Sequence, residues 1–234
     1  MLRRRLDQLS SGSPTADLGD ILVFAGPGAG KTLGALLGFS SMRREGHLDQ
    51  FVVFCHRTSI LEQWKQAAAG LGLCLKEWPC TDAAAKAADG LLVTYQGAGR
   101  QLKPLQQQLG QLQADRCMAI ADEAHHLGLD PEDPKAPAWG QTFQALTESF
   151  RLRVGLTGTP FRADNLGFCA ARRIRIVQDG MVMEQIRPDL CVEPRDLIAA
   201  GDVRPLEFRF QDGWVEHSRE AVSYTHLRAH ETQS

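Results

Sequence analysis

Short apolar runs alternate with amphipathic segments through the first two thirds of the chain. Runs apolar on both faces and too short for helices predict strands at residues 21–24, 51–55, 73–78, 91–94, 117–121 and 154–157. Between them, apolar residues recur at helical spacing, which predicts helices over 32–44, 59–71 (with Ser59 as N-cap), 100–113 and 139–150. Buried strands separated by helices are typical of a parallel sheet covered on both sides. The pattern therefore predicts an α/β fold, a mostly parallel sheet with helices on both faces.

The first expected strand runs into a glycine-rich stretch, AGPGAGKT, at residues 25–32. Glycines here let several backbone N–H groups approach one anion, because no side chain obstructs them. Lys31 can reach the β- and γ-phosphates of a nucleotide, and the Thr32 hydroxyl can bind Mg²⁺. A turn that binds nothing is the alternative, which the preceding strand and the following Lys-Thr disfavour. The predicted phosphate-binding residues are Gly26, Pro27, Gly28, Ala29, Gly30, Lys31 and Thr32.

A pair of carboxylates follows the strand predicted at residues 117–121, in the sequence Asp122-Glu123-Ala124-His125-His126. In an open α/β sheet, ligands bind outside the carboxyl ends of the strands, so this pair should face the glycine-rich loop. Asp122 can hold Mg²⁺ through water, and Glu123 can orient and deprotonate an attacking water. An exposed acidic turn is the alternative for the carboxylates alone. Together with the loop, they predict hydrolysis of a nucleotide with Mg²⁺.

Composition narrows the choice of partners. The 234 residues carry a formal net charge of −2, so a nucleic acid would be bound by local loops and not by an overall basic field. The six cysteines form no C-x-x-C pair, which favours reduced thiols over a disulfide framework or zinc site. We find no apolar run of about 18 residues and no hydrophobic signal region after Met1. We therefore expect a cytoplasmic protein with no membrane partner.

Five ordered blocks resemble superfamily 2 helicases and translocases of the DEAH type, the group that includes type III restriction enzymes. They are AGPGAGKT, HRTSILEQW, VTYQ, DEAHH and LTGTPFR, and they cover roughly residues 20–165. The resemblance implies a RecA-like P-loop NTPase fold that uses ATP and Mg²⁺. His56 stands where the family usually has a proline, and no segment before the loop matches the family's adenine-recognition motif.

The resemblance also implies a role for each matching residue. Lys31, Asp122 and Glu123 correspond to catalytic positions, with Thr32 and Asp122 as metal-binding ones. Backbone contacts to nucleic acid, which track a strand without reading its sequence, fall on Arg57, Ser59, Thr94 and Gln96. The residues that the resemblance implies couple the nucleotide state to nucleic-acid binding are His125, Thr157 and Thr159. A surface arginine at 57 and a capping hydroxyl at 94 are the alternatives. Trp64 and Trp139 are interpreted as core aromatics.

The sequence divides into four parts by character. Residues 1–19 form an N-terminal segment, and residues 20–165 a helicase-type ATP-binding domain. In residues 166–221 we expect an incomplete connection towards a second RecA-like domain, with a helix, a turn and a strand after Pro194. Residues 222–234, from VSYTHLRAHET onwards, resemble a translated adapter sequence and not native protein.

These observations favour the ATP-binding half of an ATP-dependent helicase or translocase that acts on nucleic acid, with DNA the preferred substrate. On this hypothesis the chain hydrolyses ATP poorly alone, because the second domain supplies an arginine to the nucleotide. The translocating subunit of a restriction endonuclease system is a second hypothesis. A third is a P-loop ATPase unrelated to nucleic acid, for which exchanging Arg57 would have no effect.

Overall fold

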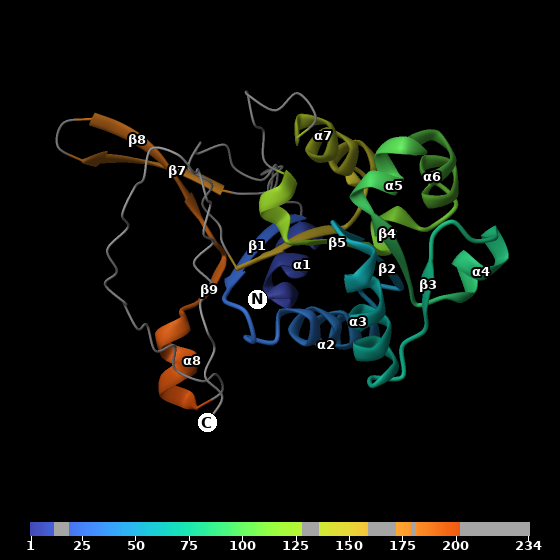
Figure 1. Cartoon of the computed structure of the whole chain (residues 1–234), viewed down its shortest axis with the longest axis horizontal. Coiled ribbons are helices and arrows are strands. Elements are labelled where there is room, and N and C mark those ends of the chain that lie inside the picture. The colour runs from blue at the N-terminus through green and yellow to red at the C-terminus, as the bar shows by residue number, and fades with distance from the viewer. Residues whose placement is uncertain (12–18, 128–135, 159–171, 179–180, 202–234) are drawn as a thin grey trace, which may run out of the picture. The chain divides into compact units, whose positions relative to one another are not determined.

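The computed structural model describes residues 1–11, 19–127, 136–158, 172–178 and 181–201 (Figure 1). The strands are β1 Asp20–Ala25, β2 Gln50–Cys55, β3 Leu75–Glu77, β4 Gly90–Thr94, β5 Cys117–Asp122, β6 Leu152–Thr157, β7 Arg172–Gln178, β8 Met181–Arg187 and β9 Leu190–Val192. The α-helices are α1 Leu2–Ser10, α2 Lys31–Arg44, α3 Thr58–Ala69, α4 Asp82–Ala87, α5 Tyr95–Arg100, α6 Leu102–Leu109, α7 Ala136–Thr147 and α8 Pro194–Ala200. Two short 3₁₀ turns, η2 Ala114–Arg116 and η3 Ala124–Leu127, flank β5.

Seven strands form one sheet in the order β3-β4-β2-β5-β6-β1-β9, and each neighbouring pair is parallel. The carboxyl ends of β1, β2, β4, β5 and β6 therefore lie along one edge, as expected for an open α/β sheet. Each of the five sequence blocks begins at or beside one of these strand ends. Strands β7 and β8 form a separate antiparallel ribbon. The predicted α/β fold with a mostly parallel sheet is confirmed.

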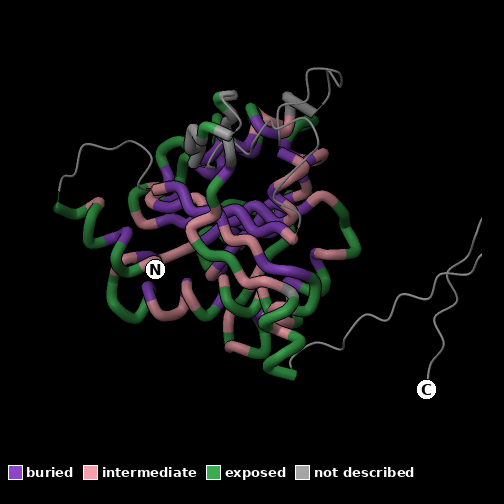
Figure 2. Tube along the Cα trace, turned by 90° about the vertical axis from the view of Figure 1, so that its left-hand side faces the viewer, coloured by how far each residue is buried: buried purple, intermediate pink, exposed green. Residues whose placement is uncertain are grey.

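Alternate residues of the central strands enter two separate cores. On β2, Val52 and Phe54 pack in the cluster that contains α5, α6 and α7, whereas Phe51 and Val53 pack with α1, α2 and α3. Successive side chains of a strand point to opposite faces, so this alternation means that helices cover both faces. Figure 1 shows α2 and α3 on one side of the sheet and α5, α6 and α7 on the other. Figure 2 shows buried residues concentrated along the strands between these two layers.

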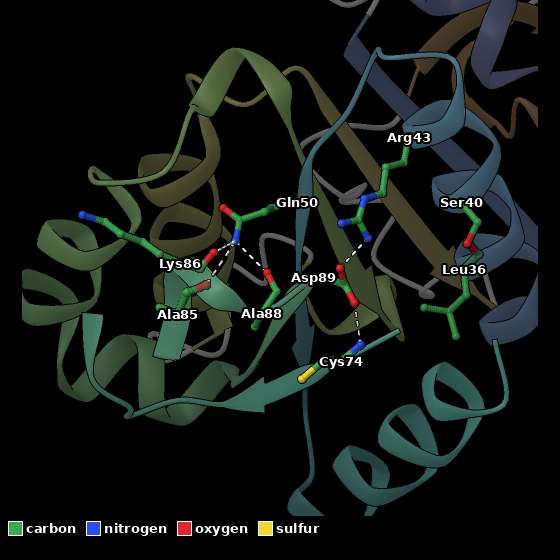
Figure 3. A network of polar contacts seen from close by, with 9 residues as sticks. All are labelled: Leu36, Ser40, Arg43, Gln50, Cys74, Ala85, Lys86, Ala88 and Asp89. Atoms are coloured by element: carbon green, nitrogen blue, oxygen red, sulfur yellow. Dashed lines mark hydrogen bonds and ion pairs between the residues drawn. The ribbon is translucent and has the colours of Figure 1, made fainter. Parts of the chain in front are cut away.

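Polar contacts tie the helices to the amino-terminal edge of the sheet, opposite the glycine-rich loop (Figure 3). Arg43, in the last turn of α2, forms an ion pair with Asp89, whose other carboxylate oxygen accepts a hydrogen bond of 2.6 Å from the Cys74 N–H. The Gln50 side-chain amide donates to the carbonyls of Ala85 at 3.1 Å and Ala88 at 2.7 Å. These contacts therefore join helix α2 and the residues around α4 to the first residue of β2 and the residues directly before β3 and β4.

The structure corrects the sequence predictions at several element ends. Helix α3 begins at Thr58, and extended Arg57 is its N-cap residue in place of Ser59, with no capping side chain. The helix expected over 100–113 is shorter: α6 covers Leu102–Leu109, with Gly110 as its C-cap residue. Arg100 is the last residue of a separate helix, α5, because the backbone leaves helical geometry at Gln101. Leu112 lies beyond α6 yet is buried in the core.

Several C-terminal elements test or extend the predictions. Helix α8 at Pro194–Ala200 confirms the helix expected there, whereas the strand expected after it lies outside the described residues. Sequence patterns did not predict α4, α5, β9 or the β7–β8 ribbon. Among the helices that the structure describes, none has the length and apolar character needed to cross a membrane.

Candidate active site

The glycine-rich loop connects the end of β1 to the start of α2. Gly28 and Gly30 have φ angles of 77° and 71°, a left-handed geometry that other residues adopt only at a cost. The Lys31 ammonium folds back over the loop and donates to the carbonyl oxygens of Ala25 at 3.0 Å and Gly26 at 3.3 Å. Because phosphate is a stronger acceptor for this cation than a neutral carbonyl, the loop can exchange these contacts for a nucleotide.

The end of β6 lies against the same loop. A β-carbon added at Gly158 would stand 3.5 Å from the Ala25 carbonyl oxygen and 3.7 Å from Lys31 Nζ. The block LTGTPFR and the block AGPGAGKT are therefore neighbours in space, as β1 and β6 are neighbours in the sheet. Thr159 lies outside the described residues.

Asp122, the last residue of β5, is buried but holds two hydrogen bonds. One carboxylate oxygen accepts from the Trp64 indole N–H at 2.9 Å, and the other accepts from the Glu123 backbone N–H at 3.1 Å. Burial raises the pKa of the Asp122 carboxyl, and the Glu123 charge adds to the rise. The Trp64 bond and the Lys31 charge oppose that rise. A cation at this carboxylate would offset the cost of its burial.

Glu123 holds its backbone in the left-handed region, with φ 51°, the one residue other than glycine to do so in the described part of the chain. Its carboxylate lies 3.3 Å from His125 Nδ1, and the same nitrogen lies 3.0 Å from Thr157 Oγ1. Strained backbone of this kind persists where the surrounding structure holds it, commonly at functional sites. The turn thus aims Glu123 beside His125 and the end of β6, so two of the three predicted coupling residues meet here.

The predicted nucleic-acid residues follow β2 and β4 on the same edge of the sheet. Arg57 and Ser59 are exposed at the start of α3. Thr94 is the N-cap of α5, and its hydroxyl accepts a hydrogen bond of 3.0 Å from the Gly97 N–H. The hydroxyl therefore caps this helix, as the alternative to a nucleic-acid contact predicted. The Gln96 side-chain amide donates a hydrogen bond of 3.0 Å to the His56 carbonyl, which joins the residues after β4 to the loop after β2.

A hollow of about 470 Å³ adjoins the glycine-rich loop. Its walls come from the first residues of α1, one face of α2 and the strands β1, β6 and β9, and Lys31, Gly34 and Val192 are among its lining residues. Most of the lining is apolar. Space for a ligand portion larger than the phosphates is therefore available next to the loop.

Residues 5–162 match the family model described as type III restriction enzyme, res subunit. The match covers more than half of the chain. The chain belongs to this family. It is thus a superfamily 2 helicase-type ATPase module, as the five blocks predicted.

Relatives of this res-subunit family member share moderate sequence identity. Uncharacterized protein ML1624 of Mycobacterium leprae is 29% identical over 196 residues, which are 83% of this chain and 31% of that protein. The chain therefore spans less than a third of that relative. The Sulfolobus solfataricus SWI2/SNF2 ATPase core in complex with dsDNA is 20% identical with a TM-score of 0.47, covering 71% of this chain and 34% of that one. The UvsW helicase of bacteriophage T4 is 14% identical with a TM-score of 0.45, covering 61% and 48%.

Two side chains that hold this site in place were not predicted as part of it. Trp64 is fully buried, as expected of a core aromatic, yet its N–H binds the Asp122 carboxylate. The Tyr95 hydroxyl donates 2.8 Å to the Asp122 backbone carbonyl, and Trp139 stacks on the Tyr95 ring at 5.9 Å. Buried Trp and Tyr usually satisfy their polar atoms, so the sequence does signal a buried acceptor. It does not identify which one.

Proposed function

We propose that this chain is the ATP-binding half of an ATP-dependent nucleic-acid helicase or translocase that acts on DNA. The observation that carries the proposal is the meeting, on one sheet edge, of the Lys31 loop, the Asp122–Glu123 turn and the exposed Arg57 loop. The first two are the parts that phosphoryl transfer to water needs, and the third is a positive contact on the same edge. The family match supports the assignment.

In this proposal the chain's own groups bind and orient ATP. The backbone N–H groups of Gly26 and of residues 28–30, together with the Lys31 ammonium, hold the phosphates, with Lys31 leaving the carbonyls of Ala25 and Gly26. Pro27 has no N–H to donate. Thr32 and Asp122 would hold Mg²⁺, which supplies charge neutralisation on the phosphate oxygens. The buried carboxylate of Asp122 fits a cation ligand, since each of its oxygens keeps lone pairs beyond its one hydrogen bond.

Glu123 is the proposed general base. It accepts a proton from the attacking water while His125 holds its carboxylate from the other side. When the γ-phosphate leaves, His125 would change its contacts with Glu123 and Thr157, and this change would signal the nucleotide state to the rest of the domain. Thr159 is proposed as the third coupling residue.

A second RecA-like domain, outside this chain, is proposed to complete the nucleotide site with an arginine. The much greater length of the mycobacterial relative leaves room for one. Such an arginine contributes about 10³–10⁵ in rate where it has been measured in GTPases, so the chain alone should hydrolyse ATP slowly.

The family description favours a second candidate, the translocating subunit of a restriction endonuclease system. This candidate uses the same ATP and nucleic-acid contacts, and it differs by adding cleavage elsewhere in the protein. Arg57, Ser59, Thr94 and Gln96 are proposed to contact the nucleic-acid backbone in both.

Calorimetry and anisotropy test the proposal with the 234-residue chain. Titration with Mg²⁺ and a non-hydrolysable ATP analogue should give binding that Lys31→Ala abolishes and Glu123→Gln retains. A fluorescent single-stranded DNA should bind in the presence of the analogue, and Arg57→Ala should weaken that binding. Analogue binding without DNA binding, unaffected by Arg57→Ala, would instead support an ATPase unrelated to nucleic acid.

A further inference from the structure

Three imidazole rings lie in contact at the carboxyl edge of the sheet. The ring centroids of His56 and His126 are 4.5 Å apart, and those of His126 and His125 are 4.3 Å apart. His125 is the residue whose Nδ1 lies beside the Glu123 carboxylate and the Thr157 hydroxyl. Ring contacts therefore run without a gap from the loop after β2 to the side chain beside Glu123. We call these three residues the imidazole stack.

His56 is also attached to both predicted nucleic-acid loops. Arg57 follows it directly as the N-cap of α3, and Gln96 donates a 3.0 Å hydrogen bond to its carbonyl oxygen. Its Nδ1 is buried and has no hydrogen-bond partner among the described residues. Burial and the charge of Arg57 lower the pKa of His56, while the carboxylates of Asp122 and Glu123 oppose that shift. A neutral ring can pack on His126 without charge repulsion.

We infer that His56 is a positioning residue that carries the nucleotide state from Glu123 to the Arg57 loop through the imidazole stack. This inference rests on the proposed function and deepens it. Closely packed side chains cannot shift independently, so a change of partner at His125 must be accommodated at His126 and then at His56. Because His56 and Arg57 share a peptide bond, displacement of the His56 ring is felt at the residue proposed to contact the nucleic-acid backbone.

Backbone NMR of the isotope-labelled 234-residue chain tests this link. Saturation with Mg²⁺ and a non-hydrolysable ATP analogue should shift the Arg57 amide resonance in the wild type. His56→Ala and His126→Ala should each lose most of that shift, whereas His56→Phe, which keeps a ring against His126, should retain it. The amide of Asp115, at the opposite edge of the sheet, serves as the unaffected reference.

Several results would overturn the inference while leaving the nucleotide site intact. One is an unchanged Arg57 shift in His56→Ala, and another is a wild-type Arg57 amide that stays still while the amides of the glycine-rich loop move. A shift lost in Trp64→Phe but kept in His56→Ala would assign the link to the Trp64–Asp122 bond instead. If the loop amides do not move at all, the proposed function itself fails. Should His56→Ala not fold, His126→Ala breaks the same stack from its other side and gives the same comparison.

Discussion

The hydrogen bond from Trp64 to Asp122 gives a prediction whose size follows from the structure. Trp64→Phe removes the donor and part of a fully buried ring. Hydrogen bonds to charged groups contribute about 1.5–3 kcal/mol, and we assign the smaller buried ring a further cost of about 1–2 kcal/mol. The free energy of unfolding should therefore fall by about 2.5–5 kcal/mol, within the range of about 5–15 kcal/mol typical of a domain.

A double-mutant cycle separates the bond from the cavity. Asp122→Asn keeps an acceptor oxygen but removes the charge, so the same Trp64→Phe change should then lose only a neutral bond of about 0.5–1.5 kcal/mol besides the cavity. The two Trp64→Phe effects should thus differ by about 1–1.5 kcal/mol, measured by urea unfolding at pH 8 in EDTA. Equal effects of Trp64→Phe in the two backgrounds would refute the reasoning, because the charge of the Asp122 carboxylate would then add nothing to the strength of its hydrogen bond with Trp64.

Three further predictions test the site and the fold that supports it. Burial raises the pKa of Asp122 in the folded protein, so its contribution to stability declines as pH rises from its unfolded pKa through its folded one. The Asn amide has one acceptor oxygen for the two N–H groups that now bind the carboxylate, and this cost does not depend on pH. Without metal, the unfolding free energy of Asp122→Asn relative to wild type should therefore be higher at pH 8 than at pH 4, and an unchanged difference would contradict this. Asp89→Ala, at the amino edge, should lower the unfolding free energy by about 1–3 kcal/mol while calorimetry shows unchanged binding of the ATP analogue; weakened binding would show that the edges are coupled. Gly140→Ala should lower the melting temperature, because its β-carbon would stand 2.5 Å from the Leu127 carbonyl oxygen. Gly34→Ala, which has open space at that position, should raise it. A shift of the melting temperature in the same direction for both variants would contradict this.

Much of the fold could be predicted because the information is local. The apolar runs of β2, β4 and β5 are buried on both faces, and a run of that kind between amphipathic segments has few other solutions. The break at Gln101 and the β9 strand were not predicted. Strand β9 has only three residues, and it is a strand because it pairs with residues 23–25 of β1. Asp189, just before it, hydrogen-bonds with both the N–H and the carbonyl of Leu22, 167 residues earlier. Contacts at that separation leave no periodicity in the sequence.

The site divides in the same way. The placement of Lys31 and Asp122 on one sheet edge was predictable because each lies in a short block directly after a strand. Trp64 in α3 and Tyr95 in α5 hydrogen-bond with Asp122, and His56 in the loop after β2 packs on His126. Only the sheet order brings these residues close to the end of β5. Each contributes through a ring and one polar atom, so in sequence each is indistinguishable from a core aromatic or a loop histidine.

That division has a consequence for which residues can differ between members of the family. Phosphate binding requires several backbone N–H groups at one point, so the glycine-rich loop tolerates little change. The proposed link from Glu123 to the Arg57 loop requires only contact between packed side chains, and a proline and a histidine at position 56 would make that contact differently. In this chain the proposed contacts are the His56 ring, tilted against His126, and the His56 carbonyl that accepts from Gln96. The proposed link between the two loops thus runs through one of the positions at which this chain departs from the family pattern.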